Sequence, residues 1–172
     1  SPKRAMDYVD RLREAFTNLD PDGAEDYANN AEAYNKKLQA LDGELREVLA
    51  TIPPQHRLLV SCEGAFTYLA TDYGLEEAFL LPVNAESEIT PKRMARLINT
   101  VRERAVPAVF CESTVSDKAQ REVAAAANSR FGGTFFVDSL SKPDGPAPTL
   151  LELQRHNVKL ILDGLTDRGG DA

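Results

Sequence analysis

The fold is decided by the stretch RLLVSCEG, residues 57–64. Its apolar run is short, follows the breaker pair Pro53-Pro54 and ends in polar residues, which is typical of a buried strand. The residues that follow, up to Tyr73, are predicted to form a helix, and Gly74 is the residue type that ends one. A buried strand followed at once by a helix indicates an α/β domain.

The same alternation continues along the chain. Further strands are predicted over residues 79–81, 107–111 and 134–137, and further helices over residues 90–101, 116–130 and 149–165. Gly132-Gly133 is predicted to form the turn before the last strand. Because parallel strands are joined by right-handed crossovers, these elements predict a four-stranded parallel sheet flanked by helices.

The chain before Pro53 is predicted to be helical. Ser1 and Pro2 suit the start of a first helix, and the turn DPDG, residues 20–23, separates it from a long helix over residues 24–52. The apolar residues of the long helix recur at steps of four and three, a heptad pattern that a coiled coil would also show. Because an α/β region follows at once, we favour a single connecting helix packed within the molecule. The predicted domains are a helical segment, residues 1–53, and an α/β lobe, residues 54–172.

Charge and motifs exclude several classes of function. A formal net charge of -7 opposes nucleic-acid binding, because a phosphate backbone needs a basic face. Neither Gly-x-Gly-x-x-Gly nor a Walker loop is present, so nucleotide chemistry is not expected. With only two histidines, His56 and His156, a His-rich metal site within this chain is excluded. Neither is expected near the carboxyl end of a strand, so no catalytic Cys–His pair is predicted.

Acidic residues follow three of the predicted strands, namely Glu63, Glu112 and Asp138. Ligands of an open parallel sheet bind beyond the carboxyl ends of its strands, so these carboxylates are expected at one edge. Carboxylates that lie close together repel unless a cation neutralises them, and oxygen ligands suit magnesium, calcium, manganese and ferrous iron. The alternative is that Glu63 and Glu112 cap the helices that follow them, and spacing alone favours capping for any single one.

Two cysteines, Cys62 and Cys111, immediately precede Glu63 and Glu112. The default interpretation is that both are free and buried, as isolated cysteines usually are. If their strands are neighbours, a disulfide across adjacent strands is the alternative, and it requires a particular geometry.

Four segments, in order along nearly the whole chain, resemble the metal-receptor proteins of manganese, iron and zinc ABC importers. They are SCEGAFTYLA (61–70) with DYG (72–74), TPKR (90–93), FCESTVS (110–116), and VDSLS (137–141) with DGP (144–146). The resemblance implies a bilobed receptor in which one long helix joins two α/β lobes and the metal lies between them. This chain matches the C-terminal lobe, and residues 24–52 match the connecting helix.

The resemblance also implies the metal ligands. It assigns Glu63 and Asp138 to the ion, whereas Glu112 and Ser139 are expected to support the ligands without binding it. Zinc-type members usually have His at the position of Glu63, and manganese- and iron-type members have Glu, so manganese or iron is favoured over zinc. The other two ligands would be histidines from an N-terminal lobe that the printed sequence does not contain. Two carboxylates alone are expected to bind a metal ion weakly.

The resemblance implies a transport role rather than an enzymatic one. The expected partners are the missing N-terminal lobe and the membrane permease of an ABC importer. The expected location is periplasmic or extracellular, with the full-length protein anchored to a membrane, often as a lipoprotein. Two alternatives are a surface adhesin or interaction protein of the same family, and a metal-dependent hydrolase using the same edge. The hydrolase is disfavoured because the chain offers no further acidic or histidine ligands there.

Overall fold

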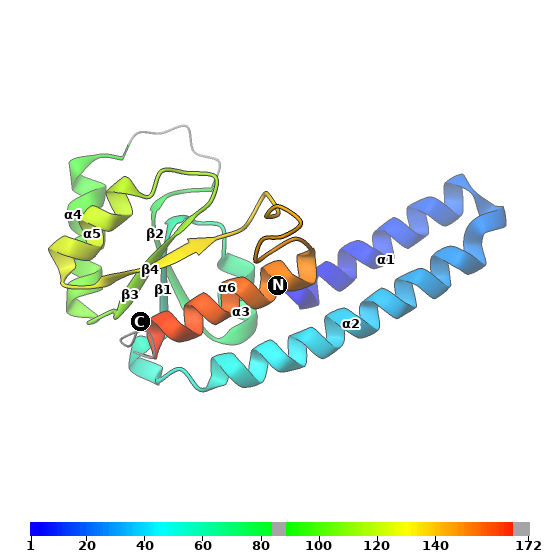
Figure 1. The fold of residues 1–172 in the computed structure, drawn as a ribbon, viewed down its shortest axis with the longest axis horizontal. Coiled ribbons are helices and arrows are strands. Elements are labelled where there is room, and N and C mark those ends of the chain that lie inside the picture. The colour runs from blue at the N-terminus through cyan, green and yellow to red at the C-terminus, as the bar shows by residue number, and fades with distance from the viewer. Residues whose placement is uncertain (84–88, 167–172) are drawn as a thin grey trace. The chain divides into compact units, whose positions relative to one another are not determined.

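The computed structural model describes residues 1–83 and 89–166 (Figure 1). The chain divides into two compact units, residues 1–47 and the residues from Val48 onward. Each unit is described by itself.

The first unit is a helical hairpin. Helix α1 (Pro2–Leu19) and helix α2 (Ala24–Ala50) are joined by a short 3-10 turn, η1 (Pro21–Gly23), as the DPDG turn predicts. The rings of Phe16 and Tyr27 lie 5.6 Å apart, and the Tyr27 hydroxyl donates a 2.7 Å hydrogen bond to Asp20. These contacts fix the tip of the hairpin.

Helix α2 confirms the predicted long helix but ends at Ala50 rather than Ile52. The guanidinium of Arg57 donates hydrogen bonds to the carbonyl of Ala50 at 3.0 Å and to that of Ile52 at 3.1 Å. Carbonyl groups at the end of a helix have no partner within the helix, so Arg57 satisfies groups that would otherwise be open. Pro53 then prevents the helix from continuing.

The second unit contains the elements of the α/β lobe expected over residues 54–172. After η2 (Pro54–His56) its elements are β1 (Leu58–Glu63), α3 (Thr67–Tyr73), β2 (Glu76–Leu81), α4 (Pro91–Glu103), β3 (Ala108–Glu112), α5 (Lys118–Ala127), β4 (Arg130–Phe135) and α6 (Leu150–Leu165). Every strand and helix expected in this lobe is present, with ends that differ by a few residues. Thr90 and Thr149 cap α4 and α6, each accepting a hydrogen bond from the backbone N–H three residues later.

The strands form two parallel pairs instead of one continuous sheet of four. Strand β1 pairs with β2, and β3 pairs with β4, but no backbone ladder joins β1 to β3 among the described strands. The two pairs nevertheless lie side by side, because the Cα atoms of Cys62 and Cys111 are 4.8 Å apart. That distance is the ordinary lateral spacing of neighbouring strands. The spatial order is therefore β2-β1-β3-β4, and the last residues of β1 and β3 lie together, because the disulfide and the Glu63 N–H that donates to Glu112 join them.

The predicted turn at Gly132-Gly133 is wrong, because both glycines lie inside β4. The ladder shifts its register between Val109 and Phe110, and Gly133 has a backbone φ of +131° that side chains rarely tolerate. A Cβ atom on Gly132 would lie 2.4 Å from the ring of Phe110. These glycines therefore serve a β-bulge and a close approach of the Phe110 ring.

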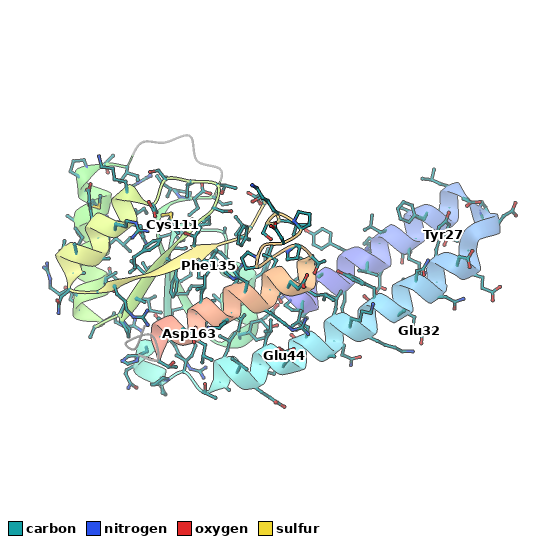
Figure 2. The ribbon with its side chains drawn as sticks, viewed as in Figure 1. Tyr27, Glu32, Glu44, Cys111, Phe135 and Asp163 are labelled. Atoms are coloured by element: carbon teal, nitrogen blue, oxygen red, sulfur yellow. A yellow bond between two sulfur atoms is a disulfide. The ribbon has the colours of Figure 1, made fainter. Side chains whose placement is uncertain are left out.

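The core of the lobe lies around the strands. The side chains of Leu59, Val109, Phe110 and Phe135 are fully buried, and the rings of Phe110 and Phe135 stack at 4.7 Å (Figure 2 labels Phe135). Helices α5 and α6 both contact the β3–β4 pair, and α3 and α4 contact β2. The strand ends are thus carried on a packed scaffold.

We predict that Gly132→Ala lowers the free energy of unfolding by about 1–3 kcal/mol, because the new methyl group overlaps the fully buried Phe110 ring and forces the packed core to shift. Urea denaturation measures the effect. Gly43→Ala is the matched control, because no atom lies within 4 Å of its new Cβ, and it should stabilise α2 by about 0.5–1 kcal/mol. Equal behaviour of the two variants would contradict the packing described around Phe110.

Candidate functional site

The acidic residues singled out above lie where strands end. Glu63 is the last residue of β1 and is half-buried, opposite Leu81 in the ladder with β2. Asp138 follows the end of β4 by three residues and is exposed. Because the carboxyl ends of β1 and β3 are joined by the disulfide and β4 runs parallel to β3, both residues follow strand ends at the same edge of the lobe.

Glu112, the last residue of β3, is the buried member of this group. Its side chain is 1% exposed, and its Oε2 accepts a 3.2 Å hydrogen bond from the backbone N–H of Glu63. Its Oε1 is buried and has no hydrogen-bond partner among residues 1–83 and 89–166. The structure thus brings Glu63 and Glu112 together. The buried side chain of Glu112 accepts a hydrogen bond from the backbone of Glu63, whose own side chain is half-buried.

Burial raises the pKa of Glu112 to about 7, because a charged carboxylate loses its hydration inside the lobe. The backbone N–H groups of Glu112, Glu63 and Cys62 work in the opposite direction, and the negative charge of Glu63 raises the pKa further. Glu112 therefore changes charge near neutral pH in the folded protein.

The helix-capping interpretation of Glu63 and Glu112 is wrong. The backbone N–H of Phe66, the N-cap residue of α3, donates to Glu77 at 2.9 Å, and the Thr67 hydroxyl donates to the same carboxylate at 2.7 Å. Glu77 on β2 is therefore the acidic residue at this helix start. Helix α5 begins only at Lys118, beyond the loop that follows Glu112.

The loop that carries Asp138 is joined to the end of β3. The hydroxyl groups of Ser113 and Ser139 lie 3.2 Å apart, and the Ser113 N–H donates a 2.8 Å hydrogen bond to the carbonyl of Phe135. Ser139, the residue after Asp138, thus links the loop after β4 to the loop after β3, in which Ser113 directly follows Glu112.

The interpretation of Cys62 and Cys111 as free thiols is wrong, since they form a disulfide (Figure 2 labels Cys111). The sequence left this open because residue spacing does not show which strands are neighbours. With β1 beside β3, the two Cα atoms come within the range that a disulfide requires. A covalent bond therefore replaces part of the missing ladder, one residue before Glu63 and Glu112.

Gln120 is a second link that the sequence did not indicate. It lies on α5, is fully buried, and its amide donates to the carbonyl of Val60 on β1 at 3.4 Å. A buried glutamine facing apolar neighbours is a signal of such a role, because its polar atoms need partners. The Val60 carbonyl on β1 thus accepts its hydrogen bond from a helix side chain, where a neighbouring strand would usually supply the donor.

The histidines do not contribute ligands at this edge. His56 lies before β1, with its Nδ1 3.0 Å from the carbonyl of Leu165. The expectation that neither histidine lies near a strand end needs correction for His156, whose ring packs edge-on against Phe136, the residue after β4. Its Nε2 lies 3.3 Å from the Thr134 carbonyl, so the role observed is packing. With both cysteines in a disulfide, no Cys–His pair exists in this chain.

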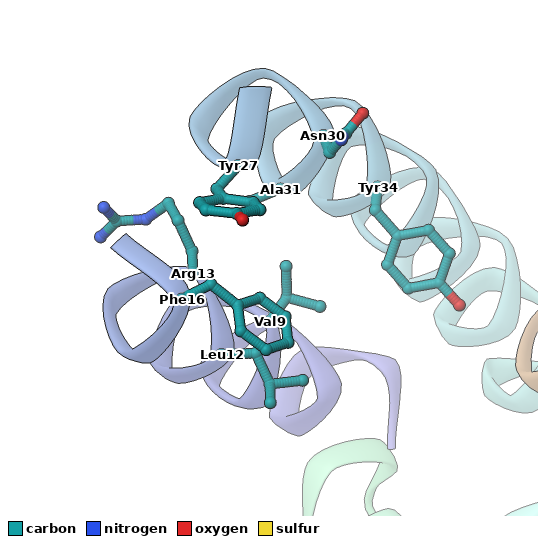
Figure 3. Close-up of a pocket in the computed structure, with 8 residues that line it drawn as sticks. All are labelled: Val9, Leu12, Arg13, Phe16, Tyr27, Asn30, Ala31 and Tyr34. Carbon is teal, nitrogen blue, oxygen red and sulfur yellow. The ribbon is translucent and has the colours of Figure 1, made fainter. Parts of the chain in front are cut away.

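A separate cavity of about 450 Å³ lies within the helical hairpin (Figure 3). Apolar side chains from α1, including Val9 and Phe16, and the rings of Tyr27 and Tyr34 from α2 line it. These walls carry no carboxylate. The cavity therefore lacks the charged oxygen ligands that a hard cation needs.

Comparison with known proteins agrees with the motifs. The family model described as "Zinc-uptake complex component A periplasmic" matches residues 1–164. The chain belongs to this family. Its members are metal-binding receptors of importers rather than enzymes, which confirms the resemblance drawn from the motifs.

Individual family members are similar over most of the chain. The iron-binding protein YfeA of Yersinia pestis is 44% identical over 164 residues, which cover 95% of this chain and 53% of that protein. The manganese-binding lipoprotein MntA of Halalkalibacterium halodurans is 33% identical over the same share of the chain and 55% of its own length. A solved structure, the manganese-bound periplasmic metal-binding protein of Candidatus Liberibacter asiaticus, has a TM-score of 0.89 and 39% identity, covering 96% of this chain and 61% of that one. The chain thus spans about half the length of the curated relatives that it matches.

A helix that crosses a bilayer needs a long, strongly apolar stretch. No helix within residues 1–83 and 89–166 is long and apolar enough to do so.

We predict that the pKa of Glu112 shapes the pH dependence of stability in metal-free protein. Below pH 4.5 the carboxyl group of Glu112 is protonated in both the folded and the unfolded chain. Between pH 4.5 and about 7 it is ionised in the unfolded chain but still protonated in the folded chain. The free energy of unfolding should therefore fall across this window, by up to about 3 kcal/mol, and level off above it. Urea denaturation with a chelator present, from pH 4 to 8, measures this. Glu112→Gln should flatten the curve and the exposed control Glu122→Gln should not; an unchanged slope in Glu112→Gln would contradict the assignment.

Proposed function

We propose that this chain is the C-terminal half of a substrate-binding component of an ABC importer, and that it contributes Glu63 and Asp138 as carboxylate ligands to a divalent metal ion. The observation that carries the proposal is that these residues follow the carboxyl ends of β1 and β4, on adjacent strand pairs whose carboxyl ends are joined by the disulfide. Family membership supports the transport role.

Glu112 and Ser139 have supporting roles in this proposal. Glu112 accepts the N–H of Glu63, so it restricts the backbone from which that ligand projects. Ser139 meets Ser113, which restricts the loop that carries Asp138. Ligands held in this way lose less conformational freedom when the ion binds.

The cargo that we propose is manganese or ferrous iron, in preference to zinc. Two carboxylates provide oxygen ligands, which suit these ions better than they suit thiophilic ions. Zinc binds most sites more tightly than manganese does, so ligand type and geometry have to supply the preference. The iron-binding and manganese-binding relatives support this assignment.

Two carboxylates form only part of a coordination shell. The remaining ligands would come from a second lobe, for which we expect histidines, and a membrane permease would receive the ion. A periplasmic or cell-surface location is supported by the periplasmic family and its lipoprotein members, and by the disulfide, because disulfides persist in oxidising compartments. No observation on the described residues favours the adhesin alternative, which stays a prediction.

The test is manganese binding by the full-length protein, measured by isothermal titration calorimetry. Glu63→Gln and Asp138→Asn keep the size of each side chain and remove its charge. Each should weaken manganese binding at least about 10-fold, which corresponds to about 1.4 kcal/mol.

Glu103→Gln is the matched control for loss of one negative charge. Glu103 is exposed at the end of α4, and its neighbour Arg104 pairs with Glu76 at the start of β2, at the opposite end of the strands. Its affinity for manganese should equal that of the unsubstituted protein. Unchanged affinity in both Glu63→Gln and Asp138→Asn would refute the proposed ligands.

A further inference from the structure

A second group of metal-ligating residue types lies at the ends of β1 and β3. The two sulfur atoms of Cys62 and Cys111 and a carboxylate oxygen of Glu112 lie within 4.8 Å of one another. All three side chains are buried, with exposures of 3%, 0% and 1%. Neither Glu63 nor Asp138 belongs to this group.

Glu112 provides an independent sign that the group is built for a ligand. Its Oε1 is buried without a hydrogen-bond partner in the part of the chain that the structure describes. A buried carboxylate oxygen without a partner is costly, and the bonded sulfur atoms beside it have no proton to donate. A positive ion at this point would provide the missing interaction.

The oxidation state of the cysteines decides whether an ion can bind here. Sulfur in a disulfide is a poor metal ligand, whereas two thiolates and one carboxylate are a donor set that zinc accepts. Two zinc–sulfur bonds of about 2.3 Å in tetrahedral geometry hold the sulfurs roughly 3.8 Å apart. Cysteines whose Cα atoms are 4.8 Å apart reach that separation by rotation of their side chains.

We propose that Cys62, Cys111 and Glu112 form, in the dithiol state, a buried site for a thiophilic divalent cation of the zinc class, and that the disulfide closes this site. Three protein ligands leave the fourth position of a tetrahedral ion open. The site is distinct from the carboxylate pair and does not depend on the transport function. Formation of the disulfide therefore removes two thiolate ligands close to the carboxylate site, which we assign to a harder ion.

Opening the site requires a two-electron reduction of the disulfide. A phosphine reductant and one water molecule convert the disulfide into two thiols, while the phosphine becomes its oxide. The cation then binds as the two thiols release their protons to solvent, and Glu112 binds as a carboxylate. No further oxidant or reductant is needed.

The test uses cobalt(II) as a spectroscopic substitute for zinc, titrated into full-length protein treated with a phosphine. The reduced protein should show a thiolate-to-cobalt charge-transfer band in the near ultraviolet, which zinc suppresses and which the oxidised protein lacks. Glu112→Gln should weaken cobalt binding at this site at least about 10-fold. Absence of the band in reduced protein at saturating cobalt, or unchanged affinity in Glu112→Gln, would overturn the proposal.

Glu63→Gln separates this proposal from the transport site. It should leave the charge-transfer band in place even if manganese binding is lost; loss of the band would place the cobalt at the carboxylate pair and contradict the thiolate site. If reduction unfolds the protein, zinc should restore its far-ultraviolet circular dichroism, and Glu112→Gln should need at least about 10-fold more zinc. Failure of excess zinc to refold the reduced protein would also overturn the proposal.

Discussion

Strands β1 and β3 lie next to each other without a backbone ladder, and side-chain interactions hold them together. The Cys62–Cys111 disulfide is the covalent link, and Glu112 accepts the N–H of Glu63 just beyond it. Gln120 from α5 donates to the carbonyl of Val60 on the same strand. The position of one strand pair relative to the other therefore depends on side chains: the disulfide, the carboxyl group of Glu112, the amide of Gln120 and the apolar core around the strands.

The junction between the β1–β2 pair and the β3–β4 pair matters because the two proposed ligands lie on different pairs. Glu63 belongs to the β1–β2 pair, and Asp138 follows the β3–β4 pair. A cation bound by both would bridge the junction, so ion binding and the stability of the junction are coupled. The raised pKa of Glu112 is a consequence of the same arrangement, because the carboxylate that spans the junction is removed from water.

The order of elements and the candidate ligands could be predicted from sequence because they depend on local signals. Apolar runs bounded by proline and glycine predicted the strands, and Thr90 and Thr149 marked two helix starts that the structure confirms. The disulfide, the break between strand pairs and the true start of β4 could not be predicted in this way. Each depends on which residues become neighbours in space: Cys111 beside Cys62, and the Phe110 ring against Gly132. Whether Glu63 and Asp138 bind metal stays a prediction.

The most direct measurement is a crystal structure of the full-length protein with bound manganese, located by its anomalous scattering. We expect one manganese ion in bonding contact with carboxylate oxygens of both Glu63 and Asp138, with Glu112 still accepting the Glu63 N–H. A manganese ion that contacts neither carboxylate, or only one of them, would contradict this expectation.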